Sequence, residues 1–198
     1  MILKDKLNGK KIVLGSKSPR RQQLINQLDI PFEVRVTNDE DETHPEGLLY
    51  TEVPEYLAKK KSDRLLNSLK DNEILITSDT IVWCKNRILG KPESREDAIE
   101  ILGQLSNDRH EVVTGICLAG LGKTRVFHVS TTIFFRKLSQ SEIEYYVDNY
   151  RPYDKAGAYG IQEWIGCIGV ERIEGSFYNV MGLPLQTLYA ELLAFVDG

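Results

Sequence analysis

The sequence predicts a mixed α/β fold, because short apolar runs of strand type alternate along the chain with segments of helical periodicity. The run 12–14 (Ile-Val-Leu) is typical of a buried strand, whereas the apolar residues between 98 and 105 recur at one-face helical spacing. The chain has 198 residues, 41% hydrophobic and 27% charged, which is enough to bury a full core. We find no repeat, low-complexity tract or clear linker, so we expect a single domain over residues 1–198, with room for two lobes.

The first predicted unit is a strand, a loop and a helix. The strand at 12–14 runs into Gly15, and a helix is expected to begin directly after Ser18. A serine oxygen can accept a hydrogen bond from an unpaired backbone N–H, and Pro19 has no N–H to satisfy, so this pair is typical of a helix start.

A second helix is predicted to begin near residues 53–54. Its apolar face comprises Leu57, Ala58, Leu65 and Leu69. A strand at 74–76 follows, and a second strand segment at 81–83 resumes beyond the polar group 77–80 (Thr-Ser-Asp-Thr). We expect this polar group to interrupt the apolar run.

A third helix is predicted after Ser94, because Asp97 three residues later completes a capping pattern. Its inner face comprises Ala98, Ile101, Leu102 and Leu105. Two β-rich segments at 111–119 and 125–135 flank residues 120–123, whose two glycines suit a hairpin turn.

The last two predicted helices also carry recognisable starts. Ser139 with Glu142 forms another capping box, and Pro184 is expected in the first turn of the closing helix. The inner faces are predicted to be Ile143, Tyr146, Val147 and Tyr150 for the first helix, and Leu185, Leu188, Leu192 and Val196 for the second. The acidic segment 38–47 is the most loop-like stretch of the chain.

Composition argues against several classes of function. The 25 Lys and Arg residues against 29 Asp and Glu give a net charge of −4 and no broad basic stripe, so we expect no nucleic-acid partner. No apolar stretch is long enough to span a bilayer, and polar residues interrupt the N-terminal segment where a signal peptide needs an apolar core. The three cysteines show no pairing pattern for disulfides or zinc. We therefore expect a cytoplasmic protein with no membrane partner.

Residues 15–21, GSKSPRR, place two hydroxyls and two guanidinium groups at a helix start: Ser16, Ser18, Arg20 and Arg21. Arginines are unfavourable there, because the N-terminal end of the helix dipole is positive. Together with the free N–H groups of the first turn they would form a site that prefers phosphate oxygens. The alternative is that both arginines point into water.

Lys61 lies four residues from both Leu57 and Leu65, so a helix places it in the apolar stripe. Either its stem snorkels to solvent or its partly buried ammonium contacts a phosphate. Lys91 lies on a turn fixed by Pro92 and offers another ammonium at a helix start, although an ordinary surface lysine fits the same pattern.

Asp79 lies in the polar group that interrupts an apolar strand. Desolvating a carboxylate is costly unless it is paired, hydrogen-bonded or bound to a metal, so Asp79 is a candidate functional acid; the alternative is an Asx turn. Glu42 in the acidic loop can supply a second carboxylate for a hard divalent ion such as Mg²⁺, although most acidic loops are simply solvated.

Five segments in chain order resemble the signatures of the Maf family, the septum-formation-related nucleoside triphosphate pyrophosphatases. They are LGSKSPRR, LAKKKSD, SDTIVW, LGKPESREDAIEILGQLSNDRHEVVTG and DKAGAYGIQEWIG with IEGSFYNVMGLPL. The resemblance extends from about residue 12 to residue 185. It implies an elongated central β-sheet flanked by helices, two lobes with a cleft between them as in inosine triphosphatase-like folds, and a homodimer.

The activity implied by this resemblance is hydrolysis of a nucleoside triphosphate between its α and β phosphates, releasing the monophosphate and pyrophosphate with the help of Mg²⁺ or Mn²⁺. Asp79 matches the catalytic base, and Asp79 with Glu42 would hold the metal. The other matched pocket positions are Ser16, Arg20, Arg21, Lys61, Lys91 and Lys155, to which the helix-start pattern adds Ser18. A role in nucleotide-pool housekeeping and cell-division arrest is also implied.

Base selection is matched by Arg20, Thr80 and Gln162. The Asp-Thr pair at 79–80 resembles the subgroup acting on dTTP and UTP, whereas the subgroup acting on 7-methyl-GTP tends to have Asp-Gln there. The chain departs from the family pattern at Ser78, at 107–108 and at 163–164, the last directly after Gln162, which bears on base preference. The alternatives are the 7-methyl-GTP subgroup, a non-catalytic nucleotide-binding regulator, and a phosphosugar or nucleotidyl transferase.

Overall fold

A computed structural model describes residues 2–37, 41–120 and 122–197 of the chain. The chain divides into two compact units, each with its own core. Unit 1 comprises residues 1–79, 114–129 and 182–198, and unit 2 comprises residues 80–113 and 130–181.

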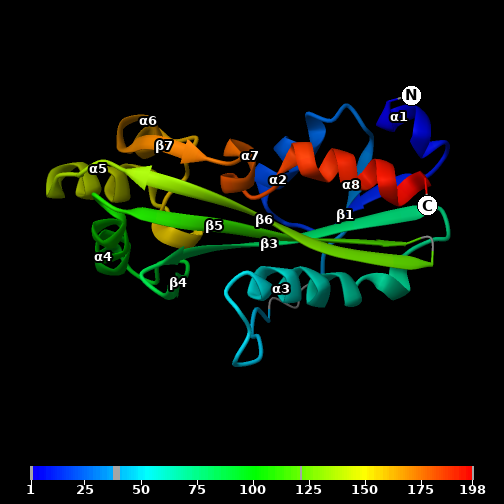
Figure 1. Cartoon of the computed structure of the whole chain (residues 1–198), viewed down its shortest axis with the longest axis horizontal. Coiled ribbons are helices and arrows are strands. Elements are labelled where there is room, and N and C mark those ends of the chain that lie inside the picture. The colour runs from blue at the N-terminus through cyan, green and yellow to red at the C-terminus, as the bar shows by residue number, and fades with distance from the viewer. Residues whose placement is uncertain (1, 38–40, 121, 198) are drawn as a thin grey trace. The chain divides into compact units, whose positions relative to one another are not determined.

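The helices and strands alternate along the chain, as expected (Figure 1). Unit 1 contains α1 (Leu3–Leu7), β1 (Lys11–Leu14), α2 (Pro19–Asn26), β2 (Phe32–Val34), α3 (Glu52–Asp63), the 3-10 helix η1 (Leu66–Ser68) and α8 (Leu185–Asp197). Unit 2 contains β4 (Arg87–Leu89), α4 (Arg95–Leu105), α5 (Gln140–Tyr150), the 3-10 helix η2 (Ala156–Ala158), α6 (Trp164–Gly169), β7 (Val170–Glu174) and α7 (Phe177–Val180). Three described strands have residues in both units: β3 (Glu73–Cys84), β5 (Arg109–Gly120) and β6 (Lys123–Phe135).

All the described strands belong to one sheet with the order β2-β1-β3-β5-β6-β7, and β4 pairs with β3. β1 is parallel to both β2 and β3, with Ile12 opposite Phe32 on one side and Ile74 on the other. The β3–β4 and β6–β7 pairs are antiparallel. The sheet is therefore mixed, and the predicted mixed α/β class, a central sheet with flanking helices, is confirmed. The cleft between two lobes stays a prediction.

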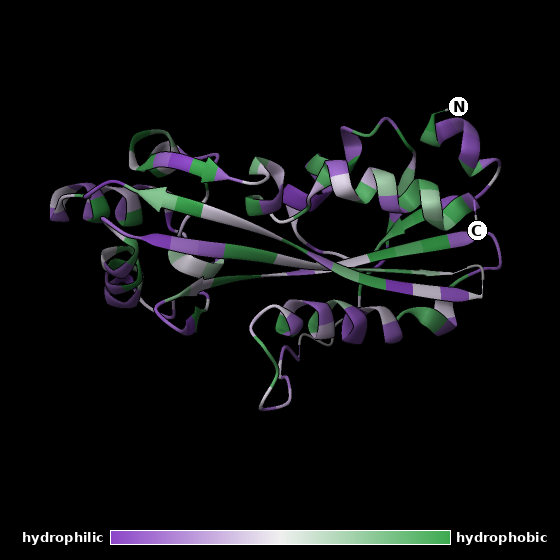
Figure 2. Cartoon of the chain, viewed as in Figure 1, coloured by the Kyte–Doolittle hydropathy of each residue, from purple (hydrophilic) through white to green (hydrophobic). Residues whose placement is uncertain are grey.

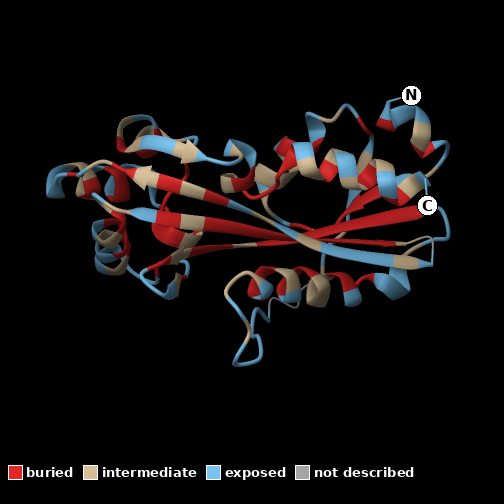
Figure 3. Ribbon diagram, viewed as in Figure 1, coloured by how far each residue is buried: buried red, intermediate tan, exposed pale blue. Residues whose placement is uncertain are grey.

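The core of unit 1 forms between the sheet and α3. Figure 1 shows α3 on one side of the strands and α8 on the other, and Figure 2 shows polar and apolar turns alternating along both helices. The buried cluster between α3 and the sheet comprises Val13, Ala58, Leu65, Leu75, Cys117 and Ala119. Figure 3 shows the central strands largely buried, and buried and exposed residues alternating along α3. This packing fixes α3 against β3, which matters for the site below.

The core of unit 2 joins α4 and α5 to the parts of the long strands that lie in this unit: the ends of β3 and β6 and the beginning of β5. Its largest fully buried side chains include Tyr146 on α5, together with Leu102 and Leu105 on α4. Gly157 in η2 has a φ of +71°, and a Cβ there would lie 2.8 Å from a methyl carbon of Val82. A glycine is therefore required where η2 approaches β3.

The predicted interruption at residues 77–80 is wrong, because β3 is continuous from Glu73 to Cys84. Two of the polar side chains find partners without breaking the strand: the Thr77 hydroxyl donates to the Ala58 carbonyl at 2.7 Å, and Asp79 pairs with Lys61. The buried Ser78 hydroxyl makes no hydrogen bond within the described part of the chain. The Asx-turn alternative for Asp79 is wrong for the same reason.

Several helix details also differ from expectation. Leu65 and Leu69 lie beyond the end of α3, although Leu65 is buried. Tyr150 is the last residue of α5 and is 39% exposed, because the helix ends before its inner face is covered. In α8 Phe195, not Val196, completes the buried face.

The serine caps are where they were predicted. Ser18, Ser94 and Ser139 each accept a hydrogen bond from the backbone N–H three residues later, and Ser139 with Glu142 makes the full capping box. The predicted turn at 120–123 includes position 121 and the acidic segment includes 38–40, which lie outside the described residues. Among the described residues, no helix combines the length and apolar character that crossing a bilayer requires.

Candidate active site

The loop between β1 and α2 is drawn tightly onto β3. The Gly15 N–H donates to the Ile76 carbonyl at 2.8 Å, and a Cβ at Gly15 would lie 2.6 Å from Cγ2 of Thr77. The Ser18 N–H donates to the Ser16 hydroxyl at 3.2 Å, and the Ser18 hydroxyl accepts from the Arg21 N–H at 3.5 Å. The predicted hydroxyl pair therefore lies at the start of α2, beside β3.

Arg21 is turned inward from the helix start. Its Nε donates to the Gly182 carbonyl and its Nη1 to the Ser78 carbonyl, both at 2.9 Å. Burial lowers the pKa of Arg21, while the nearby negative charge of Asp79 opposes this effect. The alternative in which both arginines point into water is wrong for Arg21, which anchors α2 to β3 one residue before Asp79.

The second arginine of the pair, Arg20, is partly exposed. Its positive charge contributes to lowering the pKa of Arg21, so the two guanidinium groups lie within electrostatic range of each other. Two like charges at a helix start repel, and an anion that contacts both would relieve that repulsion.

Lys61 bridges the two predicted acids. Its Nζ lies 2.5 Å from Oδ1 of Asp79 and 3.1 Å from Oε1 of Glu42. The Asp79 side chain is 10% exposed, the Lys61 side chain 23% and the Glu42 side chain 45%, so the cluster runs from the core outward. The snorkelling alternative for Lys61 is wrong, because its ammonium contacts carboxylates.

The local fold explains why these groups meet. The hydrogen bond from Thr77 to the Ala58 carbonyl ties β3 to α3 one helical turn before Lys61 and two residues before Asp79. A buried carboxylate is tolerated when a cation neutralises it, and Lys61 supplies that charge. The Lys61–Asp79 ion pair and the Thr77–Ala58 hydrogen bond therefore join α3 to β3 at adjacent points.

The same donor set fits a divalent cation. Two carboxylates, Asp79 and Glu42, converge on one positive charge, and carboxylate oxygens are the ligands that Mg²⁺ and Mn²⁺ prefer. Within residues 2–37, 41–120 and 122–197, no three His, Cys, Asp or Glu side chains gather as a metal-binding group. Mg²⁺ commonly uses one or two carboxylates and completes its shell with water and phosphate, so two suffice.

Two predicted lysines lie on neighbouring segments of unit 2. Lys155 has a 10% exposed side chain and pairs with Asp154 at 2.8 Å and Glu163 at 3.2 Å. Lys91 is exposed, and the preceding residue, Gly90, accepts a hydrogen bond from the Gly157 N–H at 3.0 Å. This bond holds the Lys91 turn against the segment that follows Lys155.

The remaining predicted positions are the base-selection residues. Thr80 follows Asp79 directly on β3 and is half-buried, whereas Gln162 is exposed on a turn closed by a 3.0 Å bond from the Glu163 N–H to the Gly160 carbonyl. Unit 1 brings together Ser16, Ser18, Arg20, Arg21, Glu42, Lys61 and Asp79. Unit 2 carries Thr80, Lys91, Lys155 and Gln162. That both sets contact one ligand stays a prediction.

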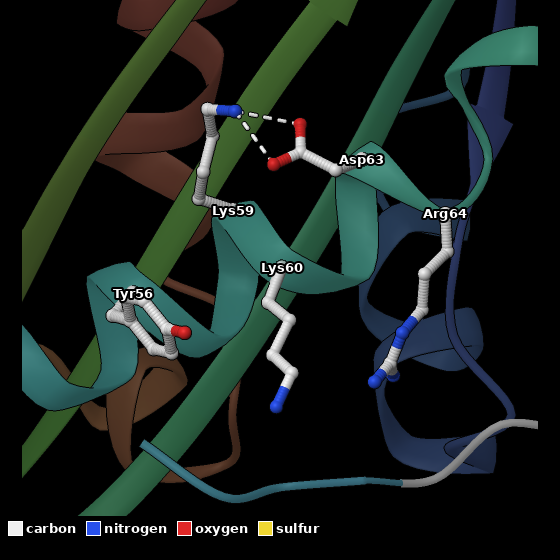
Figure 4. Close-up of a pocket in the computed structure, with 5 residues that line it drawn as sticks. All are labelled: Tyr56, Lys59, Lys60, Asp63 and Arg64. Carbon is white, nitrogen blue, oxygen red and sulfur yellow. Dashed lines mark hydrogen bonds and ion pairs between the residues drawn. The ribbon is translucent and has the colours of Figure 1, made fainter. Parts of the chain in front are cut away.

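A surface pocket on the outer face of α3 is separate from these predicted residues (Figure 4). It is lined by Tyr56, Lys59, Lys60, Asp63 and Arg64. Lys59 pairs with Asp63 at 2.6 Å across one helical turn, and Lys60 donates to Asp41 and Thr43. These cations are engaged by neighbouring acids and carbonyls.

Sequence reasoning missed two participants. The sequence predicts Thr77 only as part of a polar interruption, yet its hydroxyl joins β3 to α3. It predicts Tyr146 only as a core residue, yet the Tyr146 hydroxyl contacts Glu163. A hydroxyl in an otherwise apolar face was the available signal in both cases, because a buried O–H needs a partner.

The start of α2 carries two arginines and two serines, and Arg21 ties it to the strand that bears the lysine-paired Asp79. Cations and backbone N–H groups at a helix start are typical of proteins that bind phosphate ligands. The family model described as "Maf-like protein" matches residues 11–195, and the chain belongs to this family.

Curated relatives are similar over nearly their whole length. The dTTP/UTP pyrophosphatase of Parabacteroides distasonis is 53% identical over 185 residues, covering 93% of this chain and 96% of the relative. That of Porphyromonas gingivalis strain W83 is 51% identical over 196 residues, covering 98% of each. Among solved structures, the Ham1 protein of Staphylococcus aureus aligns with 96% of this chain and 99% of its own at a TM-score of 0.49 and 20% identity.

Proposed function

We propose that this chain is a nucleoside triphosphate pyrophosphatase that hydrolyses dTTP and UTP to the nucleoside monophosphate and pyrophosphate. Relatives of about half identity over nearly the whole chain carry the name dTTP/UTP pyrophosphatase. The Asp79-Thr80 pair and Gln162 agree with that subgroup. The alternative subgroup acting on 7-methyl-GTP is therefore disfavoured.

One observation supports the hydrolytic reading above the others: the Lys61 ammonium lies between Asp79 and Glu42 beside the anchored start of α2. Cleavage of a phosphoanhydride requires neutralisation of the charge on the phosphate oxygens and an acceptor for the proton of water. The cluster supplies both kinds of group within unit 1.

In the proposed reaction, Asp79 accepts a proton from a water molecule as the water oxygen bonds to the α-phosphorus. The bond from that phosphorus to the α–β bridging oxygen breaks, and pyrophosphate leaves with the bridging oxygen. Ser16, Ser18 and Arg20 bind phosphate oxygens at the start of α2, where N–H groups and cations favour anions. Arg21 contributes from its anchored position, and Lys61, Lys91 and Lys155 add positive charge.

A divalent cation, Mg²⁺ or Mn²⁺, belongs to this proposal, with Asp79 and Glu42 as the residues that would hold it. When bound, such an ion neutralises phosphate charge and makes water easier to deprotonate. Lys61 keeps the Asp79 and Glu42 carboxylates close together, because its positive charge offsets the repulsion between them. Base selection is assigned to Arg20, Thr80 and Gln162, and the functional unit to a cytoplasmic homodimer.

The decisive experiment incubates the purified chain with Mg²⁺ or Mn²⁺ and a panel of triphosphates: dTTP, UTP, CTP, GTP, ATP and 7-methyl-GTP. Products are separated by ion-exchange chromatography, and pyrophosphate is measured with and without EDTA. We expect dTMP or UMP plus pyrophosphate in equal amounts, lost with EDTA and restored by excess Mg²⁺.

Three other results would each contradict the proposal. Binding of dTTP without release of pyrophosphate would indicate a nucleotide sensor. A joined product that forms only when a phosphosugar or nucleotide acceptor is added would indicate a transferase. Preferential cleavage of 7-methyl-GTP would assign the chain to the other subgroup.

A further inference from the structure

The carboxylate of Glu163 is a meeting point for three segments of unit 2. It accepts a hydrogen bond from the Tyr146 hydroxyl on α5, and its Oε1 lies 3.2 Å from Nζ of Lys155. Tyr146 is fully buried, and the side chains of Lys155 and Glu163 are 10% and 21% exposed. Contacts of this kind are strong because the charged partners are largely screened from water.

The same tyrosine also holds the turn that carries Gln162. The Tyr146 hydroxyl accepts from the Gly160 N–H at 3.0 Å, and the Glu163 N–H closes the turn onto the Gly160 carbonyl at 3.0 Å. A Cβ at Gly160 would lie 2.8 Å from the Glu163 carboxyl carbon and 2.9 Å from Nε2 of Gln162. The turn therefore closes directly over the Glu163 carboxylate and the Gln162 amide.

Helix capping does not explain why a glutamate is at position 163. Glu163 is the N-cap residue of α6, but its side chain makes no capping hydrogen bond. Its two oxygens go instead to Tyr146 and Lys155. Burial, and then the bond to Glu163, raise the pKa of Tyr146, so the phenol stays a proton donor to the carboxylate.

We propose that Glu163, held by Tyr146, is a positioning residue that fixes both the Lys155 ammonium and the turn carrying Gln162. This inference rests on the proposed function, in which Lys155 binds phosphate and Gln162 contributes to base selection. One carboxylate then couples triphosphate binding to base choice, because the same group that orients the cation also sets the position of the turn.

The test compares Glu163→Gln, Tyr146→Phe and the double variant. Glu163→Gln keeps the shape but removes the charge that orients Lys155, whereas Tyr146→Phe keeps the ring and removes the hydroxyl that holds Gly160. Matched controls are Glu144→Gln and Tyr145→Phe, both on α5, where Tyr145 is 50% exposed and Glu144 accepts a surface hydrogen bond from Gln140. Binding of a non-hydrolysable α,β-imido analogue of dUTP is measured by calorimetry, together with KM, kcat and thermal midpoint.

We expect Glu163→Gln to weaken analogue binding and raise KM by about five- to tenfold with kcat within about twofold, as for the loss of one charged contact. Tyr146→Phe should weaken binding by a smaller factor and reduce the preference for UTP over CTP. The double variant should bind no worse than Glu163→Gln alone, because both changes interrupt one chain of contacts. Neither control should change affinity or preference.

The inference is overturned if the wild type is active and the Glu163→Gln and Tyr146→Phe variants fold, yet both variants keep the wild-type affinity for the analogue and the wild-type base preference. It is also overturned if the losses of binding free energy in the two single variants add up fully in the double variant. The same holds if analogue affinity falls only in those variants whose thermal midpoint falls, and in proportion to that fall. If Tyr146→Phe does not fold, Glu163→Gln combined with Lys155→Gln provides the same test of coupling. Failure of the wild type to release pyrophosphate would instead overturn the proposed function.

Discussion

Asp79 shows how a single side chain can be both buried and charged. Its carboxylate is tolerated inside β3 because Lys61 on α3 neutralises it at 2.5 Å, and Glu42 shares the same ammonium. The arrangement places this acid beside the helix start that carries Arg20 and Arg21, because Arg21 donates to the carbonyl of Ser78, the residue before Asp79. Its proposed role as proton acceptor follows from that setting.

Asp79→Asn preserves the size of the side chain but cannot accept the proton. We expect kcat for dTTP to fall by about a hundred- to ten-thousandfold, the usual contribution of a general base. Circular dichroism should be unchanged, because Lys61 keeps its contact with Glu42. The control is Asp71→Asn at an exposed position outside the cluster. Near-normal turnover by the folded Asp79 variant would remove this residue from the mechanism.

The two arginines of α2 should respond differently to truncation. Arg21→Ala removes the donors to the Gly182 and Ser78 carbonyls, so we expect the free energy of unfolding to fall by about 2 kcal/mol or more. Arg20→Ala should leave stability unchanged within about 0.5 kcal/mol and lower kcat/KM about tenfold or more, as expected for a surface phosphate contact. Urea denaturation measures the loss of stability, and pyrophosphate release measures the loss of activity. Equal losses of stability in the Arg20 and Arg21 variants would contradict the different roles given to the two arginines.

At the level of elements, the position of α3 depends on a glycine in β5. A Cβ at Gly115 would lie 2.2 Å from the backbone carbon of Pro54, so the helix that carries Lys61 packs directly on the strand. No side chain larger than hydrogen fits this contact without moving α3.

Gly115→Ala is therefore expected to lower the free energy of unfolding by about 1–3 kcal/mol and to reduce kcat, because α3 shifts and carries Lys61 away from Asp79. Gly103→Ala in α4 is the matched control, since its Cβ would meet no atom within 4 Å. It should be neutral or stabilising by up to about 1 kcal/mol. Chemical denaturation and steady-state kinetics test both; a Gly115 variant as stable and active as wild type would show that the contact relaxes freely.

The start of β3 is joined to the end of β2 by a charged contact. The Arg35 guanidinium donates to both oxygens of Glu73 at 2.8 and 3.1 Å, and the Lys70 N–H donates to Oε2 at 3.0 Å. The bonds from Arg35, followed by the one from Lys70, lower the pKa of Glu73 from 4.5 to about 2.

A lowered carboxyl pKa stabilises the folded state above the unfolded value, and this stabilisation is lost as the pH falls from 4.5 to about 2. Glu73→Gln should therefore be less stable than wild type above pH 4.5, and the difference should shrink towards pH 2. Urea unfolding across this pH range measures the difference, with Glu46→Gln at an exposed loop position as control. A gap between wild type and Glu73→Gln that does not change with pH would contradict the assignment.

For the whole molecule, the shared strands connect the two units along the backbone. β3, β5 and β6 each cross the boundary between the units, at 79–80, 113–114 and 129–130. Unfolding of one unit would therefore break backbone hydrogen bonds in strands that continue into the other unit. This continuity favours cooperative unfolding.

We expect differential scanning calorimetry to give one transition, with a ratio of calorimetric to van't Hoff enthalpy of about 1. Ser139→Ala, which removes the capping box of α5 in unit 2, should cost about 1 kcal/mol and lower the midpoint of that single transition. Ser139→Asp should restore most of the loss, because aspartate also caps a helix. Two separated transitions, of which only one moves, would contradict the cooperative picture.

Local chemistry was predictable from the sequence wherever the partners are close along the chain. The caps at Ser18, Ser94 and Ser139 and the strand at 12–14 follow from contacts within about four residues. The failures arise where distant partners act. The polar run at 77–80 suggests a break in the strand, because the sequence does not show that Ala58 and Lys61 of α3 provide partners for Thr77 and Asp79.

The sequence by itself determined the mixed α/β class, the three serine-capped helix starts and the family, because hydrophobic periodicity, caps and ordered motifs depend on residues that are close along the chain. Only the tertiary structure decided that Asp79, Lys61 and Glu42 form one cluster, that Arg21 turns inward, and that Glu163 joins Tyr146 to Lys155. Those contacts join residues 17 to 161 positions apart, except for the Glu163–Lys155 pair, whose members are closer along the chain. Long-range pairings of this kind depend on how sheet and helices pack, and no local pattern encodes that packing.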